Sequence, residues 1–210
     1  MMPGEHGRHG RRCFSSGFAA AGLLLALPLP GSSATPAAPA ARFVDTLGQK
    51  VVAVLRDERL DRQARLEQLS RIIDEATDLT LVARLVLGRY WREASEAQRK
   101  EYVALFRALI LKTMADRLDS YGGETYEIVG TQPVDERDTM VSTRIARPGG
   151  TPIAVDWRIR NESGRLVLID IVAEGVSMVV TQRSEVAEIA ARAGLDGLLE
   201  EMRRRLGRSA

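Results

Sequence analysis

Few side chains in this sequence can act as nucleophiles or as soft metal ligands, and they lie close to the N-terminus. The single cysteine and the two histidines are Cys13, His6 and His9. Beyond residue 40 there is no thiol nucleophile, no disulfide, and no imidazole for a serine–histidine–aspartate relay. A zinc or copper site in that part would lack its usual nitrogen and sulfur ligands. We therefore expect neither a metal site nor a cofactor.

Carboxylates and one serine remain as candidates for catalysis. Asp170 lies in an apolar stretch where burial could raise its pKa, whereas Asp156 is expected to face solvent, opposite Trp157. Ser177 lacks both the G-x-S-x-G elbow of a nucleophile and a histidine to activate it. A non-catalytic protein is favoured, and an enzyme that uses Asp156 or Asp170 is the alternative.

The first 40 residues have the organisation of an export signal. Met1 to Arg12 is polar and basic, and Gly17 to Leu29 is uncharged and apolar, which is shorter than the roughly 20 residues that span a bilayer. Small residues near Ala34 and Ala40 fit a signal-peptidase site. The pair Arg11-Arg12 also resembles a twin-arginine signal, and general secretion remains the alternative. Residues 1–40 are predicted to be a cleaved signal peptide and residues 41–210 one domain exported to the cell envelope.

Charge beyond this segment is balanced. The first 40 residues hold three of the 30 Lys and Arg and one of the 28 Asp and Glu, which leaves 27 of each sign. A nucleic-acid-binding domain needs a basic stripe, so we expect no nucleic-acid partner.

Apolar spacing of three and four residues predicts helices in the first half of the domain. One stripe runs from Phe43 to Leu55, and a second follows Asp61. Asp78 is expected to cap a third helix that ends at Gly88, with Tyr90 and Trp91 in a short connection. Ser95 and Gln98 form a capping box for a helix from about Glu96 to Asp119.

After Gly123 the apolar residues recur every second position, which predicts strands. They are expected over residues 126–132, 139–147, 153–160 and 166–174, joined by short turns into an antiparallel meander. Helix returns from about Val179, and Gly194 interrupts it. The expected fold is α+β, with helices packed on one curved four-stranded antiparallel sheet. Such a cone usually carries its ligand site at the mouth.

An apolar pocket between the sheet and the long helix is the expected site. Its candidate lining residues are Phe106, Ile110, Met114, Met140, Val155, Trp157, Ile159 and Val172. Each could equally be ordinary core, because a pocket wall and a core have the same apolar pattern.

The segment from Asp170 to Met178, followed by Arg183-Ser184, resembles the MlaC family, also called the Ttg2 or toluene-tolerance family. Residues 88–91 with 95–106 are similar to the segment around that family's long helix, and residues 156–159 to its third strand. The resemblance covers essentially the whole predicted domain. Leu166 departs from the family, which often has Trp there, and this could alter one pocket wall.

This resemblance implies a cystatin/NTF2-like fold and a non-enzymatic periplasmic carrier of phospholipid, with tails inside and the headgroup near the mouth. It also implies shuttling between a membrane-anchored lipid-binding subunit of an inner-membrane ABC transporter and an outer-membrane lipoprotein complex. Glu174 or Arg183 could touch the headgroup, or they could build the turn that fixes the last helix. Another envelope lipid such as a hopanoid is an alternative cargo, and a structural protein with a filled core is a further alternative.

Overall fold

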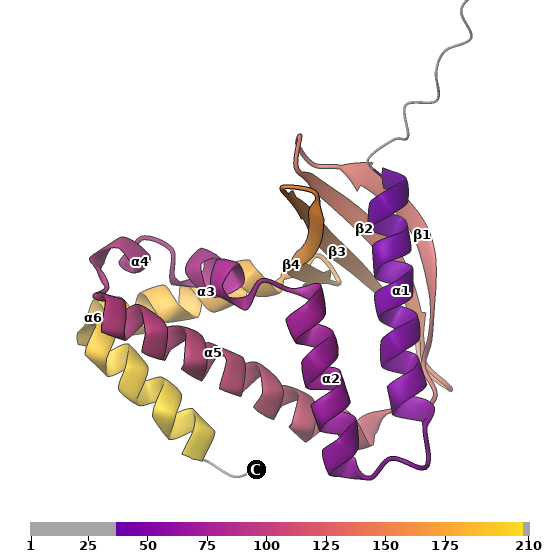
Figure 1. Cartoon of the computed structure of the whole chain (residues 1–210), viewed down its shortest axis with the longest axis horizontal. Helices are drawn as coiled ribbons and strands as arrows, with labels where there is room; N and C mark the ends of the chain where they lie inside the picture. Colours follow the sequence, from indigo (N-terminus) through magenta and orange to yellow (C-terminus); the bar gives the residue numbers. More distant parts are fainter. Residues whose placement is uncertain (1–36, 208–210) are drawn as a thin grey trace, which may run out of the picture. The chain divides into compact units, whose positions relative to one another are not determined.

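Helices, one sheet and a final helix follow one another along the chain. The computed structural model describes residues 37–207 (Figure 1). Its elements, in chain order, are α1 Ala37–Arg56, α2 Arg62–Ala76, α3 Leu79–Leu87, α4 Tyr90–Glu93, α5 Glu96–Arg117, the 3-10 turn η1 Leu118–Ser120, β1 Thr125–Pro133, β2 Asp138–Ala146, β3 Ile153–Glu162, β4 Arg165–Ala173, β5 Val176–Ser177 and α6 Met178–Gly207. The predicted signal peptide falls almost entirely outside the described residues. Ala40, the later of the two expected cleavage positions, is a buried residue of α1.

Local side-chain chemistry starts the helices where the sequence predicts. Asp61 and Asp78 each accept a backbone N–H of the first turn that follows, at 2.7 and 2.9 Å. Ser95 and Gln98 form the complete capping box at the start of α5. These contacts satisfy N–H groups that have no partner inside the helix. The predicted cap at Asp78 and the predicted capping box at Ser95 are confirmed, and Asp61, where a helix was expected to start, is a cap as well.

The sheet is an antiparallel meander in the order β1-β2-β3-β4-β5, which confirms the predicted topology with one more strand than expected. The fifth strand is short because β4 turns back through Glu174 and Gly175, whose φ angles are 49° and 80°. Positive φ at both central residues is the geometry of a type I′ hairpin turn. Two residues are too few to show a strand period, so the sequence contained no pattern for β5.

Two other element boundaries differ from expectation. Residues 90–93 form the one-turn helix α4 instead of a plain connection. The long helix α5 ends at Arg117, and residues 118–120 tighten into η1. Such a 3-10 turn is common at helix ends because it satisfies last-turn carbonyls.

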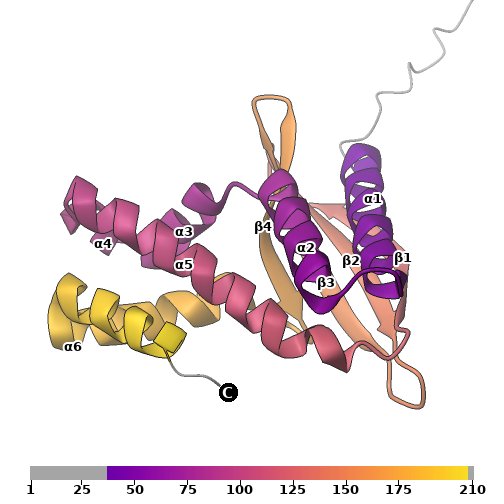
Figure 2. The same cartoon turned by 60° about the horizontal axis from the view of Figure 1, so that its bottom comes forward.

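The helices divide into two groups around the sheet (Figures 1 and 2). Helix α1 lies across one sheet face, where Ala40 and Val44 are buried against Val141 and Ile159. Helices α3, α5 and α6 make a separate apolar cluster beside the sheet. The predicted break at Gly194 is confirmed, since its φ of 71° kinks α6 and turns its second arm back onto α5.

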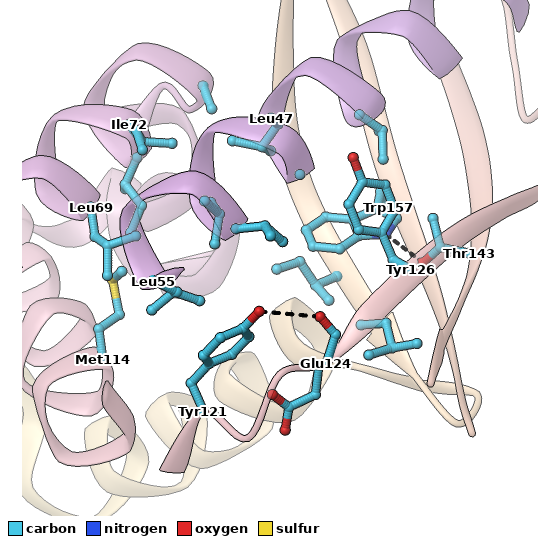
Figure 3. A pocket seen from close by; sticks show the side chains of 18 of the residues that line it. Leu47, Leu55, Leu69, Ile72, Met114, Tyr121, Glu124, Tyr126, Thr143 and Trp157 are labelled. Carbon is cyan, nitrogen blue, oxygen red and sulfur yellow. Dashed lines mark hydrogen bonds between the residues drawn. The ribbon is translucent and has the colours of Figure 1, made fainter. Parts of the chain in front are cut away.

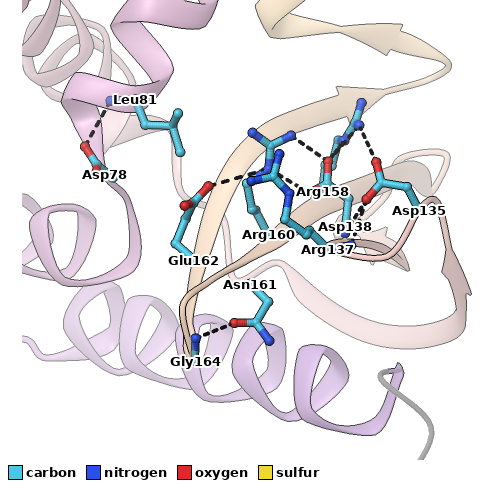
Figure 4. A network of polar contacts seen from close by, with 10 residues as sticks. All are labelled: Asp78, Leu81, Asp135, Arg137, Asp138, Arg158, Arg160, Asn161, Glu162 and Gly164. Atoms are coloured by element: carbon cyan, nitrogen blue, oxygen red, sulfur yellow. Dashed lines mark hydrogen bonds and ion pairs between the residues drawn. The ribbon is translucent and has the colours of Figure 1, made fainter.

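A buried carboxylate joins β2 to β3 on the sheet (Figure 4). The side chain of Asp138 is 0% exposed and accepts hydrogen bonds from Arg158 at 2.8 Å and from Arg160 at 2.7 Å. Burial raises the pKa of Asp138, but the hydrogen bonds from Arg160 and Arg158 outweigh it, so the net shift is downward. The carboxylate is therefore ionised at neutral pH and clamps the two strands together.

We predict that Asp138→Asn lowers the free energy of unfolding by about 3 kcal/mol at pH 7, because it leaves two guanidinium groups without their buried partner. A pKa lowered in the folded state stabilises the fold above about pH 4 and stops doing so as pH falls through the folded pKa. Denaturant unfolding should therefore show the difference from wild type shrinking below pH 4.

Glu127→Gln is the matched control, because it breaks an exposed ion pair with Arg144 on the same sheet. Exposed ion pairs contribute little to the free energy of unfolding, so this variant should unfold like wild type both at pH 7 and below pH 4. An Asp138→Asn protein as stable as the control would contradict the clamp.

Candidate functional site

A cavity of about 480 Å³ lies between α1, α2, the end of α5 and the sheet (Figure 3). Helix α1 contributes Leu47, Val51 and Leu55, which recur every four residues and so share one face. Helix α2 contributes Leu69 and Ile72, among others, from the opposite wall. The volume is within the range of about 300–1,000 Å³ typical of small-molecule sites.

The floor of the cavity is the sheet, and its polar atoms are satisfied by each other. The indole N–H of Trp157 donates to the Thr143 hydroxyl at 2.9 Å, and that hydroxyl donates to the Val155 carbonyl at 2.8 Å. The floor therefore presents an aromatic ring to the cavity, and the polar groups of Trp157 and Thr143 already have hydrogen-bond partners within the sheet.

One side wall depends on a close approach between α1 and β1. The Tyr126 ring lies against Gly48, where a Cβ atom would come within 2.4 Å of the ring. The Tyr126 hydroxyl donates to the Asp45 carbonyl at 2.8 Å. Burial, together with the hydrogen bond to the Asp45 side chain, raises the pKa of Tyr126 to about 12. Gly48 thus allows the ring to close this part of the wall.

Polar lining residues gather at one end of the cavity, where α5 passes through η1 into β1. They are Arg117, Ser120, Tyr121, Glu124 and Thr125, all exposed or half-buried. Tyr121 donates to the Glu124 carbonyl at 3.3 Å. The N–H groups of Glu124 itself and of Gly122 lower the pKa of the Glu124 carboxyl. We call this end of the cavity, residues 117–125, the mouth.

Two of the eight predicted lining residues border the cavity. Met114 reaches it from α5, and Trp157 forms its floor. The structure therefore brings together one residue from each of the two faces that the sequence analysis selected, as Figure 3 shows.

The strand residues Met140 and Val172 point away from the cavity. Met140 is the cross-strand partner of Arg158, and Val172 is the partner of Asp156. Paired residues share a sheet face and successive residues alternate, so both lie on the face opposite Trp157. An apolar residue in a strand does not by itself reveal which face it occupies, and the predicted placement of these two was wrong.

The remaining four predicted residues are not among those that border the cavity. Val155 is buried in the sheet, and Ile159 packs under the first turns of α1. Phe106 belongs to the cluster of α3, α5 and α6, where its ring stacks on Tyr102 with 6.0 Å between centroids. Ile110 lies on α5, one turn after Phe106 and one turn before Met114, and is half-buried. Any contact of these four with a ligand stays a prediction.

Glu174 and Arg183 make structural contacts. The Glu174 carboxylate accepts the Ala154 N–H at 2.5 Å, beside the type I′ turn. Arg183 donates twice to the Leu85 carbonyl in the last turn of α3, at 2.8 and 2.5 Å. These contacts match the expectation that the segment fixes the last helix, and neither residue borders the cavity.

Asp170 and Ser177 also hold the start of α6. The Asp170 carboxylate accepts the Ser177 hydroxyl at 2.5 Å and the Val179 N–H at 3.0 Å, while the Ser177 oxygen accepts the Val180 N–H at 3.0 Å. Both carboxylate oxygens are therefore engaged in capping. This arrangement offers no support for the alternative of a catalytic aspartate at position 170.

Sequence reasoning missed most of the cavity wall. Helices α1 and α2 supply much of it, and Tyr126, Tyr121 and Arg117 were not selected. The amphipathic stripes of both helices were recognised, but such a stripe looks the same whether it faces a core or a hollow.

The described residues, 37–207, contain neither a cluster of metal ligands nor a helix suited to span a membrane. No three His, Cys, Asp or Glu side chains there are grouped so as to hold a metal ion. No helix in the same range combines the length and the apolar character that crossing a membrane requires.

Comparisons with known proteins agree with the geometry. The family model described as MlaC protein matches residues 45–204. The intermembrane phospholipid transport system binding protein MlaC of Haemophilus influenzae is 28% identical over 121 residues, which is 56% of this chain and 56% of that protein. The solved structure of a phospholipid-binding protein from Ralstonia solanacearum, in complex with a phospholipid, superposes with a TM-score of 0.71 at 22% identity, covering 80% of this chain and 96% of that one. At this identity the structural match establishes the shared fold.

We predict that Gly48→Ala displaces the Tyr126 ring, because the added methyl would overlap it. Exposure of the ring to water, together with loss of the contact with Asp45, should bring the Tyr126 pKa from about 12 down towards the ordinary value of about 10. Ultraviolet-monitored titration measures this, and Tyr126→Phe identifies which step belongs to this residue.

Gly130→Ala on the same strand is the control, since a Cβ there meets nothing within 4 Å. Its tyrosine titration should equal that of wild type. An unchanged titration in Gly48→Ala would show that the ring is not held by this contact.

Proposed function

The chain belongs to the MlaC family, and on that premise we propose that it is a carrier that holds a phospholipid with its tails in the cavity. The observation that carries this proposal is the mostly apolar lining of the cavity, whose charged members, Arg117 and Glu124, both lie at the mouth. A molecule with an apolar body and a polar end matches that distribution. The names of the Haemophilus and Ralstonia proteins support the choice of a phospholipid.

The free energy of tail transfer explains why a carrier of this kind needs an enclosed site. A diacyl lipid has roughly 30 methylene groups, and exposing them to water costs on the order of 24 kcal/mol at about 0.8 kcal/mol each. A shallow groove would leave much of that surface wet. Walls on several sides, from α1, α2 and the sheet, reduce the exposed area.

The empty cavity is itself unfavourable. An apolar void of about 480 Å³ would cost on the order of 12 kcal/mol at about 24 cal/mol per Å³. This is comparable to the whole stability of a domain, about 5–15 kcal/mol, and water entering through the mouth reduces it. Bound tails would remove most of this cost, so cargo and fold stabilise each other.

The cellular part of the proposal follows the family. We place the carrier in the periplasm, exchanging phospholipid between the membrane-anchored subunit of an inner-membrane ABC transporter and an outer-membrane lipoprotein complex. The protein would act by binding and release, without a catalytic residue or a cofactor.

Filling the cavity should abolish cargo binding. We predict that Leu47→Trp, which adds an aromatic ring to the middle of the α1 wall, lowers the amount of co-purifying phospholipid at least tenfold. Lipid extraction followed by mass spectrometry of the purified protein measures this.

Val129→Trp is the matched control, because Val129 is 50% exposed on β1 and does not border the cavity. It should retain wild-type lipid. A wild-type protein that carries no lipid, or a hopanoid in place of phospholipid, would contradict the proposed cargo.

Removal of the cargo should destabilise the wild-type protein. We predict that detergent-stripped wild type melts well below the loaded protein, because the apolar walls then face a void or trapped water. Stripped Leu47→Trp should lose much less, since its cavity is already partly filled. Calorimetry measures both shifts, and equal melting of loaded and stripped wild type would count against tails in this cavity.

A further inference from the structure

Arg117 presents an uncommitted positive charge at the mouth. It borders the cavity in the last turn of α5 and is exposed. Within residues 37–207 its guanidinium makes no hydrogen bond and no ion pair. An apolar cavity therefore ends beside five N–H donors that have only water to bind.

A second guanidinium is held at the same place. The Nε of Arg56, the last residue of α1, donates to the Tyr121 hydroxyl at 3.1 Å. That hydroxyl in turn donates to the Glu124 carbonyl, which ties it to the mouth. The terminal nitrogens of Arg56 have no partner in the described part of the chain. Tyr121 thus orients one edge of the guanidinium and leaves its fork open.

The Glu124 carboxylate at the mouth is already engaged by other groups. Glu124 is the carboxylate that borders the cavity here, and one of its oxygens accepts the Gly122 N–H at 2.8 Å. Arg147 lies close enough to contribute to the lowered Glu124 pKa. Glu124 is thus engaged by the Gly122 N–H and by the charge of Arg147, which leaves Arg117 and the terminal nitrogens of Arg56 able to bind an anion.

We propose that Arg117 and Arg56 bind the phosphate of a lipid headgroup, and this inference rests on the proposed carrier function. Guanidinium groups bind phosphate through paired, charge-assisted hydrogen bonds. The two residues lie where tails in the cavity would meet solvent. The carrier then prefers lipids that bear a phosphate over neutral lipids with identical tails.

The competing location for a headgroup, Arg183, does not border the cavity. The Nε and one terminal nitrogen of Arg183 donate to the Leu85 carbonyl of α3. The charge that the family-like segment contributes is thus used to join α6 to α3.

The test is a competition between two lipids that differ only at the headgroup. Purified protein is incubated with vesicles containing equal amounts of dioleoylphosphatidylglycerol and dioleoylglycerol, then separated, and its bound lipids are quantified by mass spectrometry. Wild type should be enriched in the phospholipid. Arg117→Gln and Arg56→Gln should each lower that enrichment about tenfold, which corresponds to ~1.4 kcal/mol, a modest value for one charged hydrogen bond.

Two variants control for structure and charge. Arg92→Gln removes an exposed arginine of α4, whose side chain has no partner within residues 37–207, and should retain wild-type enrichment. Arg117→Lys keeps the charge without the fork and should lose less than Arg117→Gln. Matching melting temperatures confirm that all four variants fold.

The outcomes separate this inference from the carrier function. If wild type binds neither lipid, the carrier function fails. If all proteins bind lipid with the same headgroup ratio, the carrier function stands and the phosphate site is overturned. Excess inorganic phosphate should leave the wild-type ratio unchanged, and loss of the preference would assign the two arginines to a free anion instead.

Discussion

Water drives apolar surfaces together, so an apolar hollow persists only where contacts elsewhere hold its walls apart. Helix α1 is fixed in this way near both ends. Val44 is buried against Val141 and Ile159 of the sheet, and Val54 belongs to a cluster that includes Leu69 of α2. The middle of the helix spans the distance between these two anchors. Its apolar face therefore lines a space that the chain does not fill.

The rest of the fold keeps those anchors in place. Asp138 fixes the register of β2 and β3, which carry the cavity floor. The cluster of α3, α5 and α6 sets the position of α5, whose last turns bring Met114 to the wall. Asp170 of β4 caps the start of α6 and so ties that cluster to the sheet, while Arg183 ties α6 to α3. The segment that most resembles the family thus serves the frame around the cavity, and its polar residues are explained without a ligand.

The difference between contacts within one element and contacts between distant elements explains what could be predicted from the sequence. Helix starts at Asp78 and Ser95 were predictable because a cap depends on residues three positions apart. The cavity was not, because its walls come from elements far apart in the chain. Phe106 and Met114 lie on one stripe of α5, yet the first packs into the cluster of α3, α5 and α6 and the second borders the cavity. The spacing of apolar residues along a helix predicts which helix face is buried, but it does not show whether a core or a cavity lies against that face. The prediction for Met140 was wrong for a related reason. Its pairing with Arg158 of β3 places it on the sheet face opposite Trp157, and this pairing is not visible in the sequence pattern.

The same energy that retains a lipid opposes its release. Tails that pass through water would meet a barrier on the order of 24 kcal/mol, far above what a carrier can supply from its own stability of about 5–15 kcal/mol. Under the proposed function, an acceptor must therefore offer an apolar surface to the tails before they leave the protein. Because the cavity becomes polar and exposed at residues 117–125, the acceptor has to meet that end. The arginines at the mouth would then bind the headgroup while the lipid is carried and contact the surface of the acceptor when it is transferred.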